Sequence, residues 1–276
     1  MIKTAMTLSA GFLLLFSTSV MSDELSIPAI HAIDGTRLHQ LHSEETGFDY
    51  EILVRLPDSY DESADTVYPT MYLLDGGATY PMLAGYYRYL RFEDVIPEMI
   101  IVGLSYGTDD WREGNHRGTD YTAPTDQREH WGGAARFQRA LRSEILPLIE
   151  RAYRSDPGKR NIFGQSLGGQ FVLYTAMTEP ELFRGHIASN PALHRNLELF
   201  LKPLKSTADM SSALFVASAS ADEKIYRDPA MQWINHWNGQ TSTPWRLRAI
   251  SIDGYGHFSL APESFRQGVS WLASLE

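Results

Sequence analysis

The sequence predicts an α/β fold, a doubly wound and mostly parallel sheet with an antiparallel N-terminal hairpin. Short apolar runs, typical of strands buried on both faces, alternate along the chain with longer segments that are apolar at helical spacing. The first segment, residues 27–56, instead alternates apolar and polar residues, which indicates strands with one exposed face. Strands that alternate with helices are expected to form one sheet with helices on both faces.

Composition limits the class of protein. The chain has 276 residues, of which 43% are hydrophobic and 21% charged, so one sizeable domain with a well-developed core is expected. The formal net charge of −10 disfavours nucleic acid or an anionic membrane as a partner. The sequence contains no cysteine, which excludes disulfides, thiolate metal sites and a cysteine nucleophile.

The N-terminal residues 1–22 are typical of a cleaved secretory signal peptide. A positive charge at Lys3 precedes an apolar run, 10–20, that is too short to span a bilayer. Val20 and Ser22 suit a cut before Asp23. We therefore expect a single domain over residues 23–276 that is periplasmic or secreted and has no stable membrane anchor.

The first half of the domain is expected to contain four strands. Residues 39–42 and 48–56 form the hairpin, and the apolar runs 70–74 and 99–104 form buried strands. The third strand ends in Asp75-Gly76-Gly77, and a helix is predicted over 80–92.

Residues 105–132 have no apolar period, but they contain Tyr106, Trp111, Tyr121 and Trp131. A loop of this length inside a compact domain is usually functional. We expect it to wall a substrate pocket through Trp111, Tyr121 and Trp131.

The second half is predicted to alternate regularly. An amphipathic helix is expected over 133–153, since Phe137, Leu141, Ile145, Leu148 and Ile149 share one stripe. The later elements are strands at 185–190, 213–218 and 245–252 and helices at 231–237 and 262–275.

The motif Gly164-Gln165-Ser166-Leu167-Gly168 carries the chemistry. It lies between the apolar run Asn161-Ile162-Phe163 and a helical segment that ends before Pro180, which is the strand–turn–helix context of a nucleophile elbow. The turn places Ser166 at a helix N-terminus, where unpaired N–H groups favour a developing negative charge. Ser166 is therefore the candidate nucleophile.

A serine hydroxyl needs a base, and in this fold the acid and then the histidine follow the serine in the chain. His257 lies in a glycine-rich loop after the last strand, whereas His186 starts a strand and His236 lies within a predicted helix. The acid is expected after the strand 213–218, where Asp222 is preferred and Glu223 is the rival. The oxyanion donors are expected to be the N–H groups of Leu167 and of Gly77, chosen over Gly76.

Taken together, these segments resemble the "Putative esterase" family of α/β-hydrolases, which includes S-formylglutathione hydrolases, feruloyl esterases and enterobactin- or salmochelin-cleaving esterases. The resemblance runs from about Phe48 to Trp271 and rests on the following stretches: Tyr68-Pro69, Tyr72 to Gly76, Gly164 to Gly169, Arg117 to Pro124, Asn190-Pro191 and the late Gly256-His257. It implies an α/β-hydrolase fold and supports Ser166, His257, Asp222, Gly77 and Leu167 in the roles above. Ala219 departs from the family's usual glycine before the acid, and a serine–histidine dyad is the alternative. Gln165 replaces a common histidine, without an evident chemical consequence.

The predicted function is an exported serine hydrolase that cleaves carboxylic esters, siderophore esters among them, without a metal or cofactor. Arg112, Arg117 or Arg128 could attract an anionic substrate locally, and we include Arg117 with the three aromatic loop residues as substrate-binding candidates. Two alternatives keep the same fold: an acyltransferase that uses the same acyl-enzyme, and a non-catalytic binding protein.

Overall fold

The computed structural model describes residues 35–93, 96–202 and 212–275. The predicted signal peptide, residues 1–22, lies outside these residues. The described chain forms one eight-stranded sheet with the order β1-β2-β4-β3-β5-β6-β7-β8. The strands are β1 (Arg37–His42), β2 (Asp49–Arg55), β3 (Tyr68–Leu73), β4 (Ile100–Ser105), β5 (Ser155–Gln165), β6 (Gly185–Ser189), β7 (Ala213–Ala219) and β8 (Arg246–Ile252).

The pairing agrees with the predicted fold class. β1 pairs antiparallel with β2, and β2 pairs antiparallel with β4, whereas every pair from β4 to β8 is parallel. The predicted hairpin and the mostly parallel sheet are therefore confirmed. Because β3 to β8 run in one direction, the loops after them meet at one edge of the sheet.

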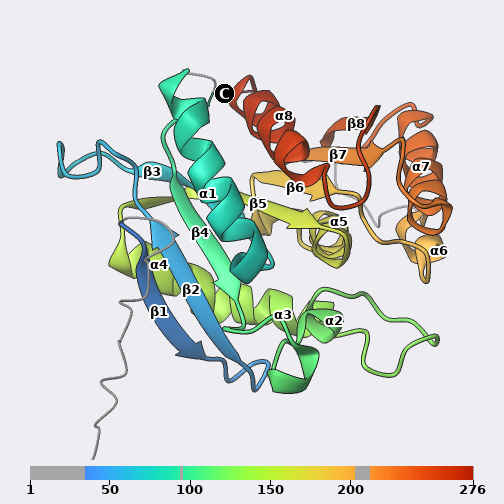
Figure 1. Ribbon diagram of the computed structural model, residues 1–276, viewed down its shortest axis with the longest axis horizontal. Helices are drawn as coiled ribbons and strands as arrows, with labels where there is room; N and C mark the ends of the chain where they lie inside the picture. The colour runs from blue at the N-terminus through green and yellow to red at the C-terminus, as the bar shows by residue number, and fades with distance from the viewer. Residues whose placement is uncertain (1–34, 94–95, 203–211, 276) are drawn as a thin grey trace, which may run out of the picture. The chain divides into compact units, whose positions relative to one another are not determined.

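Helices cover both faces of the sheet (Figure 1). The helices are α1 (Gly76–Phe92), α2 (Arg117–Asp120), α3 (Ala134–Ala140), α4 (Leu146–Ala152), α5 (Leu167–Thr178), α6 (Leu197–Phe200), α7 (Lys224–Asn238) and α8 (Ala261–Ala273). α1 and α8 pack on one face, and α3, α4, α5 and α7 pack on the other. Successive side chains of β3 point to opposite faces of the sheet. Met71 and Leu73 belong to the core beneath α1 and α8, and Tyr72 belongs to the core on the other face. This explains why the central strands are continuously apolar.

The long helix predicted over 133–153 is interrupted. A π-helical turn, η2 (Leu141–Ile145), joins α3 to α4. Pro147 lies in the first turn of α4 and has no N–H to continue the α-helical ladder, which accounts for the break. The apolar stripe survives, because Phe137, Leu141, Ile145 and Ile149 are all buried.

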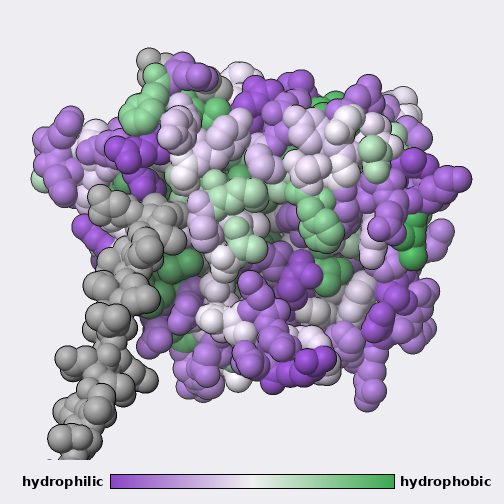
Figure 2. Space-filling model, in the orientation of Figure 1, coloured by the Kyte–Doolittle hydropathy of each residue, from purple (hydrophilic) through white to green (hydrophobic). Residues whose placement is uncertain are grey.

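The loop predicted over 105–132 contains only the short elements η1 (Trp111–Glu113) and α2. Two further short elements, η3 (Pro180–Leu182) and α6, were not predicted, because a single helical turn leaves no period in a sequence. No helix of the described ranges is long and apolar enough to cross a membrane. In the view of Figure 2, hydrophilic residues cover most of the surface, and apolar ones occur in small separate groups.

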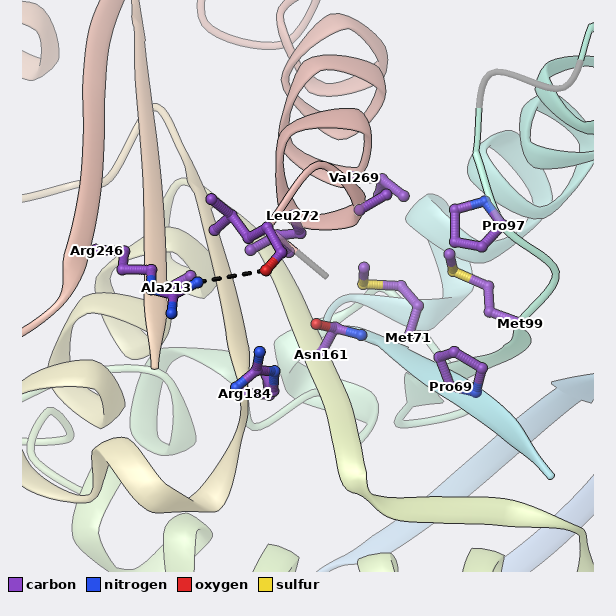
Figure 3. A pocket seen from close by; sticks show the side chains of 12 residues that line it. Pro69, Met71, Pro97, Met99, Asn161, Arg184, Ala213, Arg246, Val269 and Leu272 are labelled. Atoms are coloured by element: carbon purple, nitrogen blue, oxygen red, sulfur yellow. Dashed lines mark hydrogen bonds between the residues drawn. The ribbon is translucent and has the colours of Figure 1, made fainter. Parts of the chain in front are cut away.

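A small cavity lies at the amino-terminal edge of the parallel strands (Figure 3). Its lining includes Pro69 and Met71 of β3, Ala213 of β7 and Arg246 of β8, whose guanidinium donates to the carbonyl of Leu275 at 3.3 Å. Its volume of about 30 Å³ is far below the several hundred Å³ of a ligand pocket, so it is too small for a substrate. Two cavities of about 710 and 960 Å³ lie at the opposite edge.

Candidate active site

Ser166 occupies a sharp turn between β5 and α5. Its backbone has φ 59° and ψ −112°, a left-handed conformation that a non-glycine residue adopts only under strain. The flanking glycines make the turn possible, because a Cβ on Gly164 would lie 2.3 Å from the backbone of Gly168. The strand–turn–helix predicted around the motif is thus present.

Three side chains from three loops form a continuous hydrogen-bonded chain. His257 Nε2 lies 2.9 Å from Ser166 Oγ, and His257 Nδ1 lies 2.7 Å from Asp222 Oδ2. Because a carboxylate only accepts, Nδ1 carries the proton and Nε2 is left to accept from the serine hydroxyl. The Asp222 side chain is only 1% exposed, so its charge is held away from water beside the imidazole.

The two adjacent acidic residues have different positions. Glu223 is the N-cap of α7, and its backbone N–H donates to Asp222 Oδ1 at 2.7 Å. Each oxygen of Asp222 therefore accepts one hydrogen bond, one from His257 and one from this backbone group. Of the two carboxylates, Asp222 is the one in contact with His257.

The first turns of α1 and α5 supply N–H groups near Ser166. β3 and β5 are adjacent and parallel, so the helices that follow them, which carry Gly77 and Leu167, begin at the same edge. The first N–H groups of a helix have no carbonyl one turn earlier to bind. Gly77 lines the cavity beside Ser166, whereas a Cβ on Gly76 would lie 2.7 Å from the backbone of Leu104 in β4. Gly77 thus faces the site and Gly76 faces the sheet.

The loop 105–132 contributes an ion pair. The Arg117 guanidinium donates twice to Asp75, at 2.6 and 3.0 Å. Burial by itself lowers the pKa of Arg117, but the Asp75 carboxylate outweighs this effect and raises it. Asp75 has φ 56°, and its N–H donates to the hydroxyl of Tyr121 at 3.2 Å. Arg117 and Tyr121 therefore stabilise the turn that carries Gly77, because both hydrogen-bond to Asp75.

One of the aromatic loop residues does not line a pocket. Tyr121 is 1% exposed and packs against both Phe137 and Phe171, so the expectation that it contacts substrate is wrong. The apolar ring fills the core below the loop, and a sequence pattern cannot distinguish this from a pocket wall. Trp111 and Trp131 do line a cavity that reaches Ser166.

Two cavities meet at Ser166. The first, which we call the His257 cavity, has a volume of about 710 Å³ and is lined by His257, Phe258, Gly77 and Glu223. The second, the Trp131 cavity, has a volume of about 960 Å³ and is lined by Leu167, Trp111, Trp131, His194, Arg128 and Arg195. Ser166, Asp109, Asn115, Arg117 and Tyr226 line both.

The two cavities differ in charge. Besides Arg117 and Asp109, which are common to both, the His257 cavity has the carboxylates of Asp75 and Glu223, and the Trp131 cavity has the guanidinium groups of Arg128 and Arg195. Burial, together with Arg195, Arg128 and His257, lowers the pKa of His194, so its imidazole is neutral near pH 7. His194 therefore adds no positive charge to that of the arginines in the Trp131 cavity.

Three contacts at the site were not expected from the sequence. The amides of Gln165 and Asn190 both donate to the backbone carbonyl of His257, and the Tyr226 ring packs against the His257 ring, tilted by 35° with centroids 4.6 Å apart. The position of Gln165 beside the serine and the pair Asn190-Pro191 were visible in the sequence. Nothing in the sequence pointed to Tyr226.

This serine elbow, at the carboxyl edge of a mostly parallel sheet and in contact with a histidine and an aspartate, defines the chain as a protein of the α/β-hydrolase class. The model of the esterase family, described as "Putative esterase", matches residues 43–254. The chain belongs to this family.

Two curated relatives are similar in sequence. The ferri-bacillibactin esterase BesA of Bacillus subtilis is 33% identical over 188 residues, which cover 62% of this chain and 63% of BesA. The apo-salmochelin esterase of Escherichia coli is 26% identical over 186 residues, which cover 64% of this chain and 54% of that protein. The chain thus spans less than two thirds of the length of these relatives.

Solved structures share the fold. The BES protein from Bacillus cereus superposes with a TM-score of 0.74 at 22% identity, covering 87% of this chain and 97% of that one. An IroE-like serine hydrolase from Shewanella oneidensis superposes with a TM-score of 0.75 at 23% identity, covering 87% and 80%. At this level of identity the likeness concerns the fold alone.

Proposed function

We propose that this chain is a serine hydrolase that cleaves carboxylic esters through an acyl-enzyme. The observation that carries the proposal is the hydrogen-bonded chain from Asp222 through His257 to Ser166. The family membership and the names of the curated relatives, both esterases, support the reaction class.

The first half of the reaction forms the acyl-enzyme. His257 Nε2 takes the proton of Ser166 Oγ as this oxygen attacks the ester carbonyl carbon. The N–H groups of Leu167 and Gly77 donate to the oxyanion that develops, and Asp222 stabilises the imidazolium. His257 then returns the proton to the departing alkoxide, so the alcohol leaves and the acyl group stays on Ser166.

The second half releases the acid. A water molecule transfers a proton to His257 Nε2 and attacks the acyl carbon, and the C–O bond to Ser166 breaks when the proton returns to Oγ. Each half uses the same base and the same oxyanion donors, so one arrangement of side chains serves both.

The charge of the cavities indicates which part of the ester binds where. The alcohol must receive its proton from His257, so it belongs in the His257 cavity, and the acyl group belongs in the Trp131 cavity beside Leu167. Arg128, Arg195 and Trp131 suit an acyl part that bears a negative charge and an aromatic ring. A siderophore ester is the natural substrate we propose, in line with the names of the relatives.

Export is part of the same proposal. The sequence pattern of residues 1–22 supports secretion, and a periplasmic or extracellular enzyme would meet siderophore esters outside the cytoplasm.

The test compares residues 23–276 with the variants Ser166→Ala and Ser218→Ala on a panel of p-nitrophenyl esters. We expect Ser166→Ala to lower kcat/KM by at least about a thousandfold with an unchanged circular dichroism spectrum. Ser218 is a buried serine of β7 whose hydroxyl has no partner among the described residues, so its replacement should leave kcat/KM unchanged. Activity that survives Ser166→Ala would overturn the site.

A further inference from the structure

Two side-chain amides converge on the backbone carbonyl of His257. Gln165 Nε2 donates to this oxygen at 2.5 Å and Asn190 Nδ2 donates to it at 2.8 Å. The two residues come from different strand ends, β5 and β6, and the carbonyl belongs to the loop after β8. We call this pair of amides the His257 clamp.

Gln165 ties the histidine loop to the nucleophile. It is the residue before Ser166, so its hydrogen bond links the backbone of the serine turn directly to that of His257. The Oε1 atom of Gln165 is buried and has no partner among the described residues. A buried acceptor without a partner costs free energy, so this glutamine is a poor choice for stability alone. Of the two polar groups of its amide, only the nitrogen has a described partner, the carbonyl of His257.

Asn190 ties the same loop to the acid. Its backbone has φ 41°, a left-handed conformation that asparagine tolerates better than most residues. Its Oδ1 accepts from the N–H of Ala219 at 2.7 Å, at the end of the strand that leads to Asp222. One amide therefore bridges the segments that carry the base and the acid.

The loop of His257 is held at Tyr255, whose carbonyl accepts from the N–H of Ala221 at 3.1 Å, and at His257 itself by the clamp. It contains Gly254 and Gly256, whose backbones are the least restricted of any residue type. Asp222 and the ring of Tyr226 orient the imidazole itself, but they do not fix the backbone from which it projects. The clamp holds that backbone through the carbonyl of His257.

From this geometry we propose that Gln165 and Asn190 are positioning residues for the base. Their described side-chain hydrogen bonds reach neither the reacting atoms nor the oxyanion donors, and they act by fixing the carbonyl of His257 so that Nε2 stays within reach of Ser166 Oγ. The inference rests on the proposed role of His257. It assigns a use to the glutamine that stands where the family commonly has histidine.

The test uses Gln165→Met, Asn190→Asp and a matched control. Methionine keeps the length of glutamine without a donor, and aspartate keeps the acceptor for Ala219 but removes the donor. Gln138→Met is the control, because Gln138 is also buried and donates two hydrogen bonds, to Thr175 and Thr178, away from the site.

We expect each clamp variant to lower kcat by about 10- to 100-fold, since a displacement of about 1 Å costs that much, with KM changed less than about threefold. Gln138→Met should lower the melting temperature about as much as the clamp variants do, but it should leave kcat unchanged. Equal kcat values for Gln165→Met and the wild type, or an equal loss of kcat in Gln138→Met, would overturn the clamp.

A fluorophosphonate that labels Ser166 separates this proposal from the previous one. Slower labelling of the clamp variants than of the wild type supports the positioning role, and equal labelling contradicts it. A wild-type protein that neither hydrolyses esters nor takes up the label would instead refute the proposed function, and the clamp with it.

Discussion

Asp222, and not the adjacent Glu223, hydrogen-bonds His257: its Oδ2 lies 2.7 Å from Nδ1 of the ring. The carboxylate fixes the tautomer, because it accepts the Nδ1 proton and leaves Nε2 free to act as the base. Glu223 instead occupies the N-cap position of α7, where its side chain makes no cap hydrogen bond, and lines the His257 cavity. Replacing the carboxylate of Asp222 by an amide should therefore change kcat much more than the same replacement at Glu223.

Asp222→Asn should lower kcat by about 10³- to 10⁴-fold, since an amide that donates toward Nδ1 selects the wrong tautomer. Glu223→Gln should change kcat by less than about threefold. The measurement is steady-state hydrolysis of one p-nitrophenyl ester by both variants. A loss below about tenfold in Asp222→Asn would favour a serine–histidine dyad instead.

The arginines of the Trp131 cavity should set the charge preference of the acyl group. We compare the kcat/KM of a p-nitrophenyl ester of benzoic acid with that of the ester of 4-carboxybenzoic acid. Replacing Arg128 and Arg195 together by glutamine should lower the preference for the charged ester by about tenfold, which corresponds to about 1.4 kcal/mol. Added salt should reduce the wild-type preference in the same direction. Arg151→Gln, on an exposed position of α4, is the control.

An unchanged preference in the double variant would place the acyl group elsewhere. A preference that moves instead with the charge of the alcohol would mean that the acyl group and the alcohol occupy the opposite cavities.

Asp120 should make the stability depend on pH. Its side chain is buried, and burial raises its pKa to about 6, although hydrogen bonds from Tyr50 and Tyr106 oppose the rise. The folded state therefore holds a proton that the unfolded chain has already lost between about pH 4 and 6, so stability falls as the pH rises through this window. Relative to Asp120→Asn, the wild type should lose on the order of 2 kcal/mol between pH 4 and 6 and nothing further above pH 7.

Urea unfolding of both proteins at a series of pH values measures this difference. Burial also lowers the pKa of His186 to about 4, which acts in the opposite direction, but this histidine is present in both proteins and cancels. Parallel stability curves would show that Asp120 titrates normally.

Two glycines should respond in opposite ways to alanine. Gly164→Ala puts a methyl group 2.3 Å from the backbone of Gly168, so the elbow must deform and kcat should fall by at least about tenfold. Gly85, in α1, has nothing within 4 Å of the added Cβ, so Gly85→Ala should stabilise the fold by about 0.5–1 kcal/mol and leave kcat unchanged. Thermal unfolding and ester hydrolysis measure both effects, and an active, stable Gly164→Ala variant would contradict the steric argument.

The predictability of the site differs from residue to residue. Ser166 follows from the spacing of glycines between a strand and a helix, and His257 from its loop after the last strand, because both signals are local. The choice between Asp222 and Glu223 stayed open, since two adjacent residues at a strand end differ only in the direction of their side chains. Tyr121 was misassigned for a related reason: an aromatic residue in a long loop can turn toward the core or toward a pocket.

The sequence by itself determined the alternation of strands and helices, the hairpin at the start and the turn that carries Ser166. These depend on periodicity and on steric limits that act within a few residues. The tertiary structure alone decided which carboxylate meets His257, how charge is divided between the two cavities, and that Gln165 and Asn190 converge on the carbonyl of His257. Such contacts join residues 35 to 92 positions apart, and these residues meet only because the parallel strands end at the same edge of the sheet.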